Sequence, residues 1–421
     1  MYFKSFITYK KEEINKEMKT KAERNTRRYK EIRKAIFIPG LAAFSQFYMF
    51  QPLLPSLSES FLVSPAISSL VVSSSMIGIA LGLFMFAFYA DILHRKKLML
   101  IALFLSSLIT MLSAISWNFN VLVVFGFIKG FLLSGVIAVA IVYISEEVEV
   151  RYVGIVIGIY LAGNVLGGMW GRVVAGLISS WYDWRIATLF IGGVGIVLST
   201  FFMRLLPQSL NFNPQKIQTF QKLMYMKNFL KNPLFLGVYI LMILMMGTFV
   251  SIYNYLSFRL EMPPFSLPHY VISLLFLIYV TGVGGTITIG ALTHRIHSFR
   301  MLKILLVLFL IGTLGLFVEE LWLLVLGLSI LTFSLLGIQT VVNKIISQYA
   351  IEGKSTANCL YLICQYMGAG GIGSSTGHIL SKWGWSNFLF TLIGFILFSL
   401  LLFMLCARRY TNTYKLTKEI S

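Results

Sequence analysis

Charged residues are scarce in this sequence. Only 12% of its 421 residues are Asp, Glu, Lys or Arg, whereas about 25% is usual in soluble domains. The apolar set makes up 57%, against about 45–50% in soluble domains. Because so few charges cannot cover a water-soluble surface of this size, the composition argues against a cytosolic enzyme, a nucleic-acid binder and a disordered scaffold.

Cysteine and metal-ligand patterns are equally scarce. The three cysteines, Cys359, Cys364 and Cys406, all lie in apolar runs, which argues against a disulfide framework. No Cys, His and acid spacing suggests a metal site, and no nucleophile–base motif appears. Residues 368–373 spell a dinucleotide fingerprint, but no strand precedes them and they lie in an apolar run. We therefore expect no enzyme activity, no cofactor and no metal.

Long apolar runs are abundant. A helix that crosses a bilayer needs about 20 mostly apolar residues, and alternation typical of barrel strands is absent. The sequence predicts an all-α membrane protein with twelve transmembrane helices, near residues 36–57, 67–88, 98–117, 119–144, 154–178, 186–206, 233–258, 270–292, 301–318, 321–343, 356–380 and 386–407.

The basic residues predict the orientation of these helices. With the N-terminus in the cytoplasm, outer loops hold only Arg185, Arg259 and Lys382, and the runs themselves hold Lys129 and Arg172. All other Lys and Arg then face the cytoplasm, as the positive-inside rule requires. Both termini are therefore expected to be cytoplasmic, in a bacterial inner membrane. The net charge of +19 faces anionic lipid and needs no nucleic acid.

Composition divides the chain into five parts. Residues 207–232 are the longest polar interior stretch and are expected to be a cytoplasmic linker between two six-helix bundles, 36–206 and 233–407. Residues 1–35 lack the apolar core of a signal peptide and are expected to be a basic cytoplasmic tail, with a surface-lying helix as an option. Residues 408–421 form a second cytoplasmic tail.

The two bundles resemble each other. At a constant offset of 201, similar residues recur, and an even number of spans per half makes this a parallel repeat about an axis along the membrane normal. Chance matching of Gly-rich helices is the alternative. The matching pairs are Tyr160 and Tyr361, Asn164 and Gln365, Gly167 and Gly368, Gly176 and Gly377, and Trp184 and Trp385.

Several motifs carry a resemblance to a known family. They are Gln51-Pro52-Leu53-Leu54-Pro55, Tyr89 through Lys96, Tyr143 through Val148, Gly158 through Arg172, and Trp184-Arg185. With these, the sequence resembles the major facilitator superfamily, drug:proton antiporter type, and within it the bacterial YnfM-like exporters. The resemblance implies two pseudo-symmetric six-helix bundles that rock to give alternating access.

The resemblance also implies which residues gate the protein. The family's loop after the second span matches at Asp91, Arg95 and Lys96, although Ala87 and His94 replace its glycines. This loop, with Glu146 and Glu147 after the fourth span, is expected to latch the halves, Asp91 lying near the start of the eleventh span. The stripe of Gly163, Gly167 and Gly168 is expected to pack against the other half, although Asn164 replaces the family's Pro. Packing without gating is the alternative.

Two cations lie at membrane depth, which costs at least about 2.5–3.5 kcal/mol on insertion scales. Lys129 and Arg172 are therefore expected to face a cavity, although structural pairing of Lys129 and snorkelling of Arg172 stay open. Lys129 stands near the position where the family carries an Arg, here Gly126. Further substrate or proton-coupling candidates, for which interhelical hydrogen bonding is the alternative, are Gln46, Gln51, Asn164, Asn254, Gln339 and Gln365.

No acidic residue falls well inside a span. This favours an anionic or neutral polar substrate over a lipophilic cation. Proton carriers are then Asp91, Glu146, Glu147 or Lys129 itself, and export without protons stays open. We expect a monomeric secondary active transporter that exports a small amphipathic or anionic molecule. The alternatives are an inward sugar or nutrient permease, or a membrane sensor or lipid scramblase.

Overall fold

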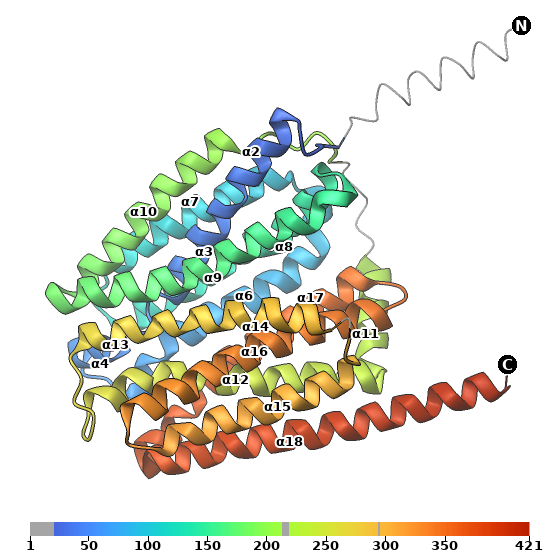
Figure 1. The fold of residues 1–421 in the computed structure, drawn as a ribbon. Coiled ribbons are helices and arrows are strands. Elements are labelled where there is room, and N and C mark those ends of the chain that lie inside the picture. The colour runs from blue at the N-terminus through green and yellow to red at the C-terminus, as the bar shows by residue number, and fades with distance from the viewer. Residues whose placement is uncertain (1–20, 213–218, 294, 421) are drawn as a thin grey trace, which may run out of the picture.

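The computed structural model describes residues 21–212, 219–293 and 295–420, without the side chains of Asp91 and residues 407–420. The described chain is helical (Figure 1), with a single isolated bridge between Ala22 and Val148. The elements of its first part are α2 (Arg27–Ala35), α3 (Phe37–Tyr48), α4 (Leu54–Phe61), α5 (Pro65–Ser68), α6 (Leu70–Tyr89), η1 (Ala90–Ile92), α7 (Arg95–Ser113), α8 (Phe119–Glu147), α9 (Val150–Trp181) and α10 (Trp184–Leu205).

The second part repeats this plan of long antiparallel helices. Its elements are α11 (Thr219–Lys231), α12 (Pro233–Glu261), α13 (His269–Leu275), η2 (Phe276–Ile278), α14 (Tyr279–Leu292), α15 (Ser298–Leu314), η3 (Gly315–Phe317), α16 (Leu321–Tyr349), α17 (Lys354–Ser375) and α18 (Gly377–Ile420). Within α18, Gly384 has φ of 75° and interrupts the helix, a conformation that glycine adopts without a Cβ clash.

Ten helices in the described part of the chain are long and apolar enough to cross a membrane. The first predicted run, 36–57, falls short because residues 49–53 form a turn that divides it into α3 and α4. The eleventh predicted run corresponds to α17, which is long enough but is rich in Gly, Ser and polar side chains. On the criteria of length and hydropathy, the described part of the chain therefore contains ten of the twelve predicted spans.

Local sequence explains where several of these helices begin. Asn118 accepts a hydrogen bond from the Asn120 amide at 2.8 Å, and Asn232 accepts one from the Leu234 amide at 3.0 Å. Asn is a favoured N-cap because its side chain satisfies a backbone N–H that has no helical partner. Pro233 follows Asn232 at the first helical position, where its missing N–H costs nothing.

In each half, a stripe of glycines allows one helix to pack closely against another. A Cβ on Gly163 or Gly167 of α9 would collide with the backbone oxygen of Phe37 or Leu41 in α3. A Cβ on Gly368 of α17 would likewise collide with the Ile243 oxygen of α12. Small residues at such positions allow two helix backbones to approach closely. Equivalent contacts thus occur in both halves.

This packing corrects one sequence-based expectation. The stripe of Gly163 and Gly167 was expected to pack against the other half, but it packs on α3 of its own half. Gly168 contacts the ring of Tyr48, also in α3. The glycine of α9 that meets the other half is Gly176, where a Cβ would collide with the Ser273 side chain of α13.

The two halves contact each other along unequal lengths of their helices. Helices α6 and α17 pack against each other from Gly370, where a Cβ would lie 3.0 Å from the Ser73 oxygen, to Cys359, whose Sγ lies 3.6 Å from the Leu83 oxygen. Helix α9 meets α13 near Gly176, and no atom lies within 4 Å of a Cβ placed at Gly154 or Gly158. Figure 1 shows α9 and α14 diverging toward the end where α2 and α11 lie. We call this end the basic end, because the loops with Arg95 and Arg295 lie there, and the opposite end the outer end.

Candidate functional site

Arg172 of α9 lies at the interface between the halves and is only 1% exposed. Its guanidinium donates hydrogen bonds to Gln51 Oε1 at 2.6 Å, to the Gly168 oxygen at 2.8 Å and to Tyr279 Oη at 3.0 Å. Gln51 belongs to the first half and Tyr279 to the second. Because hydrogen bonds of a charged group are stronger than neutral ones, Arg172 ties the two halves together.

The hydrogen bonds continue beyond Arg172 into the second half. Gln51 Nε2 donates to Asn254 Oδ1 at 3.0 Å, and Asn254 Nδ2 donates to the Gly373 oxygen at 3.3 Å. This series, which we call the interface chain, links α9, the turn at 49–53, α12 and α17. Gln51 and Asn254 are fully buried, so each amide that lost its partner would carry a desolvation cost.

Aromatic rings cover the faces of the Arg172 guanidinium. Its carbon lies 3.8 Å from the ring centre of Tyr48 and 4.1 Å from that of Tyr279. A cation over an aromatic face gains about 2 kcal/mol or more when water is excluded. The snorkelling alternative requires the Arg172 side chain to extend toward solvent. The arrangement shows instead that it is enclosed between aromatic rings.

Lys129 of α8 has a different environment. Its side chain is fully buried, its Nζ lies 4.4 Å from the ring centre of Phe50, and it has no hydrogen-bond partner among the residues that the structure describes. Phe50 precedes Gln51 in the turn at 49–53, so this one turn contacts both buried cations. Lys129 is the buried cation whose hydrogen-bonding capacity is still available to a ligand.

The remaining polar candidates are dispersed. Gln46 donates to Ser107 Oγ at 3.0 Å and accepts from Thr110 Oγ1 at 3.2 Å, so it joins helices within the first half. Gln339 lies in α16 with its Nε2 3.8 Å from the Met246 sulfur.

Two further candidates lie on helices that the interface chain links but are not part of that chain of hydrogen bonds. Asn164 of α9 faces Gly40 of α3. Gln365 of α17 is 7% exposed, and its Oε1 has no partner among the described residues. The structure therefore brings together Gln51, Asn254 and Arg172, with Lys129 across Phe50.

Three aromatic residues of this site were not predicted from the sequence. Tyr48, Phe50 and Tyr279 contact the two cations, but each stands in an apolar run among many other aromatics. The sequence did indicate that such residues exist, because a cation at membrane depth needs a partner inside the protein. Only the fold shows which ring supplies it, since Tyr279 follows Arg172 by 107 positions.

Glu146 and Glu147 lie at the basic end and bind segments attached to the first half. Arg95 donates to Glu146 at 2.8 Å. The buried Glu147 pairs with Arg28 of α2 and accepts from the Asn211 amide at 2.9 Å. Glu147 therefore holds the segment that precedes α3 and the start of the linker, and Glu146 holds the start of α7.

The remaining latch residues stand in the same region. Lys96 donates a hydrogen bond to the Leu206 oxygen, just after α10. The side chain of Asp91 lies outside the described residues, so its expected contact near the start of α17 stays a prediction.

The first prediction concerns the free energy of unfolding. An unpaired ammonium in the membrane interior costs at least about 2.5–3.5 kcal/mol, so we expect Lys129→Met to raise the unfolding free energy by about 1–3 kcal/mol. Thermal unfolding in detergent measures the change, and Lys303→Met, on the exposed side of α15, is the matched control. A lower melting temperature for Lys129→Met would contradict the absence of a partner.

The second prediction concerns the contact between the halves. Tyr279→Phe removes the hydroxyl that accepts from Arg172, which is worth about 1.5–3 kcal/mol, so the outer ends should separate about ten times more often. The measurement is the labelling rate of Ser273→Cys by a polar thiol reagent, with the three native cysteines replaced by Ser. Ser273 is fully buried, so labelling reports separation.

The control for this experiment is Tyr270→Phe in α13, the helix that carries the labelled position 273, since Tyr270 is 47% exposed. Equal labelling rates in Tyr279→Phe and Tyr270→Phe would show that the bond to Arg172 does not hold the halves together.

Comparison with known proteins identifies relatives of this chain. A chain from Buchnera aphidicola subsp. Schizaphis graminum described as an uncharacterized transporter is 32% identical over 383 residues, 90% of this chain and 92% of its own length. The Escherichia coli inner membrane transport protein YnfM is 34% identical over 276 residues, 65% of this chain and 66% of its own length.

A solved structure has the same fold. A bacterial homologue of the human lysosomal transporter Spinster, in an inward-facing and occupied conformation, aligns with a TM-score of 0.72 at 14% identity, covering 91% of this chain and 98% of that one. The sequence profile of the Major Facilitator Superfamily matches residues 36–374. The chain is a multi-pass membrane protein of the Major Facilitator Superfamily, a family of transporters and not of enzymes.

Proposed function

We propose that this protein is a twelve-span secondary transporter of the drug:proton antiporter type that exports a small amphipathic or anionic molecule. The observation that carries the proposal is Lys129, a fully buried cation without a hydrogen-bond partner among the described residues. Carrying such a group at membrane depth is costly, and an anionic substrate would offset that cost each time it binds.

The distribution of acids supports an anionic over a cationic substrate. Glu147 is fully buried but pairs with Arg28 at the basic end. Glu59, Glu261, Glu319 and Glu320 lie at or near helix ends. A lipophilic cation that reached the interface chain would meet Arg172 and Lys129 and no carboxylate from the described helices.

Alternating access is part of the same proposal. The interface chain and the contact of Gly176 with Ser273 join the outer ends, whereas α9 and α14 diverge toward the basic end. Export then requires the outer contacts to break while the basic ends approach each other. The glycines of α9 at 163 and 167 would let α9 shift along α3 during this movement.

Proton exchange also belongs to the proposal. In that exchange one proton would enter the cytoplasm for each anion that leaves, with Asp91, Glu146 and Glu147 at the basic end as the candidate proton carriers and Lys129 as the counter-charge of the anion. The protein would work as a monomer in the bacterial inner membrane, with both termini in the cytoplasm. This location is supported by the similarity to YnfM, an inner membrane transport protein of Escherichia coli.

Deoxycholate, an amphipathic anion, and ethidium, a lipophilic cation, test the proposal in proteoliposomes with an imposed pH gradient. We expect deoxycholate flux that depends on the gradient and falls about 10- to 100-fold in Lys129→Gln, because a hydrogen bond of a charged group is worth about 1.5–3 kcal/mol. Lys303→Gln, which changes an exposed Lys, is the control.

Two outcomes would contradict the proposal. Ethidium flux that persists in Lys129→Gln, without deoxycholate flux, would show a cation carrier that does not use this side chain. Flux directed only toward the cytoplasmic side would indicate an inward permease.

A further inference from the structure

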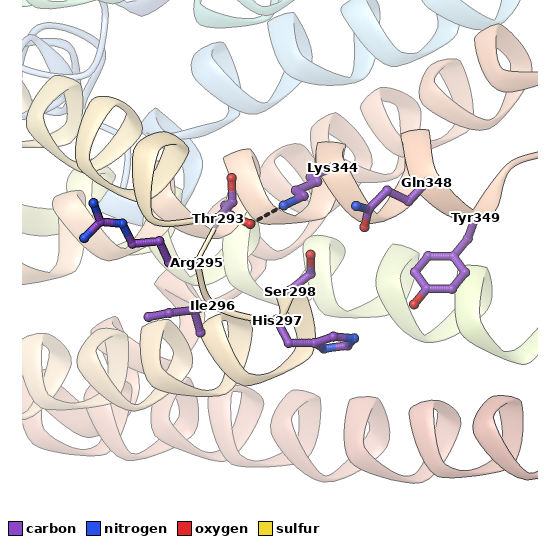
Figure 2. A pocket seen from close by; sticks show the side chains of 8 residues that line it. All are labelled: Thr293, Arg295, Ile296, His297, Ser298, Lys344, Gln348 and Tyr349. Atoms are coloured by element: carbon purple, nitrogen blue, oxygen red, sulfur yellow. Dashed lines mark hydrogen bonds between the residues drawn. The ribbon is translucent and has the colours of Figure 1, made fainter.

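A second polar site lies at the basic end of the second half, away from the interface chain. It is a pocket of about 540 Å³, within the range of about 300–1,000 Å³ usual for ligand pockets. It lies between the 293–298 connection and the last turns of α16 (Figure 2). Its lining residues are Thr293, Arg295, Ile296, His297, Ser298, Lys344, Gln348 and Tyr349.

The lining carries positive charge and no acidic side chain among the described residues. Lys344 donates one hydrogen bond to the Thr293 oxygen, and an ammonium has three donors. Ser298 begins α15, so the positive end of that helix dipole adds to the same field. Figure 2 shows Arg295 and His297 on either side of Ser298, with the Arg295 side chain extending away from Lys344.

The equivalent place in the first half is neutralised by the chain itself. Helices α8 and α16 both have 29 residues, and α7 and α15 begin directly after His94 and His297. In the first half Arg95, at the start of α7, pairs with Glu146. Counted from the helix ends, Glu146 of α8 corresponds to Gln348 of α16.

By the same count Arg95 corresponds to Ser298, so both members of this ion pair are replaced by uncharged side chains in the second half. Arg295 and Lys344 supply the positive charge of the pocket from other positions, and no acidic side chain in the described lining balances them. A bound anion would provide that balance. Phosphate is the anion that suits a basic site at a helix start, since the helix dipole and cationic side chains both stabilise its negative charge.

We propose that this pocket binds the phosphodiester of an anionic lipid headgroup. The basic end is where Lys and Arg are concentrated, and basic pockets between membrane helices on the cytoplasmic side bind acidic headgroups. Tyr349 stacks on Phe299 with ring centres 5.8 Å apart, which gives the pocket an apolar wall beside the phosphate position. The lipid would hold α15 against α16 at this end.

Native mass spectrometry of the detergent-solubilised full chain, titrated with phosphatidylglycerol, tests this proposal. We expect one lipid to bind with an affinity that falls about tenfold in Lys344→Gln, which removes a charged donor. Arg295→Gln is the second variant, because Lys344 also bonds to Thr293 and its loss can disturb the loop. Arg300→Gln, an exposed Arg outside the lining, is the matched control and should stay within about fivefold of the native affinity.

Each other outcome would overturn the proposal. Equal affinity in Lys344→Gln, Arg295→Gln and Arg300→Gln would show a general attraction to basic surface and no pocket. Equal binding of phosphatidylcholine would show that the negative charge is not recognised. Inorganic phosphate that displaces phosphatidylglycerol at equal concentration would identify a free phosphate site in place of a lipid site.

Discussion

A positive charge buried among hydrocarbon must find partners inside the protein, because lipid tails offer none. Arg172 meets this requirement with hydrogen bonds to both halves and with aromatic rings on its two faces. The partners come from separate bundles, so they remain together only while the outer ends of the bundles touch. The cost of an unsatisfied guanidinium is thereby coupled to the position of one half relative to the other.

The turn at residues 49–53 makes this coupling possible. It interrupts the first run, directs Gln51 toward Arg172 and Asn254, and places Phe50 against Lys129. Arg172 has its hydrogen bonds satisfied within the protein, whereas Lys129 has none among the described residues. One cation therefore holds the conformation, and the other is left for the substrate of the proposed transport cycle.

Much of this architecture follows from the sequence, because hydrophobic length and the distribution of Lys and Arg are local properties. The apolar runs predicted the long helices, and the offset repeat predicted related positions such as Gly167 and Gly368, which make equivalent contacts in the two halves. Lys129 and Arg172 could be singled out from the sequence, since they stand in runs that otherwise lack charge, but their expected roles toward a substrate stay predictions.

Other features depend on contacts between distant segments and were missed. The division of the first run into α3 and α4 was not predicted, although Pro52 and Pro55 stand there. The predicted partner of the α9 glycine stripe was wrong, because a stripe of small residues indicates a close approach between helices but not which helix approaches. The tie between Arg172 and Tyr279 joins helices from different halves, which sequence spacing does not reveal.

The most direct test of the account is a distance measurement across the outer ends. Spin labels at Trp181, 70% exposed at the end of α9, and at Tyr270, 47% exposed in α13, report the separation of the halves by double electron–electron resonance. With Arg172→Gln, the account predicts a second, longer distance population for this pair and an unchanged distance between labels at Trp181 and Trp117, both in the first half. A Trp181–Tyr270 distribution that stays the same in Arg172→Gln would contradict the claim that this buried charge holds the halves together.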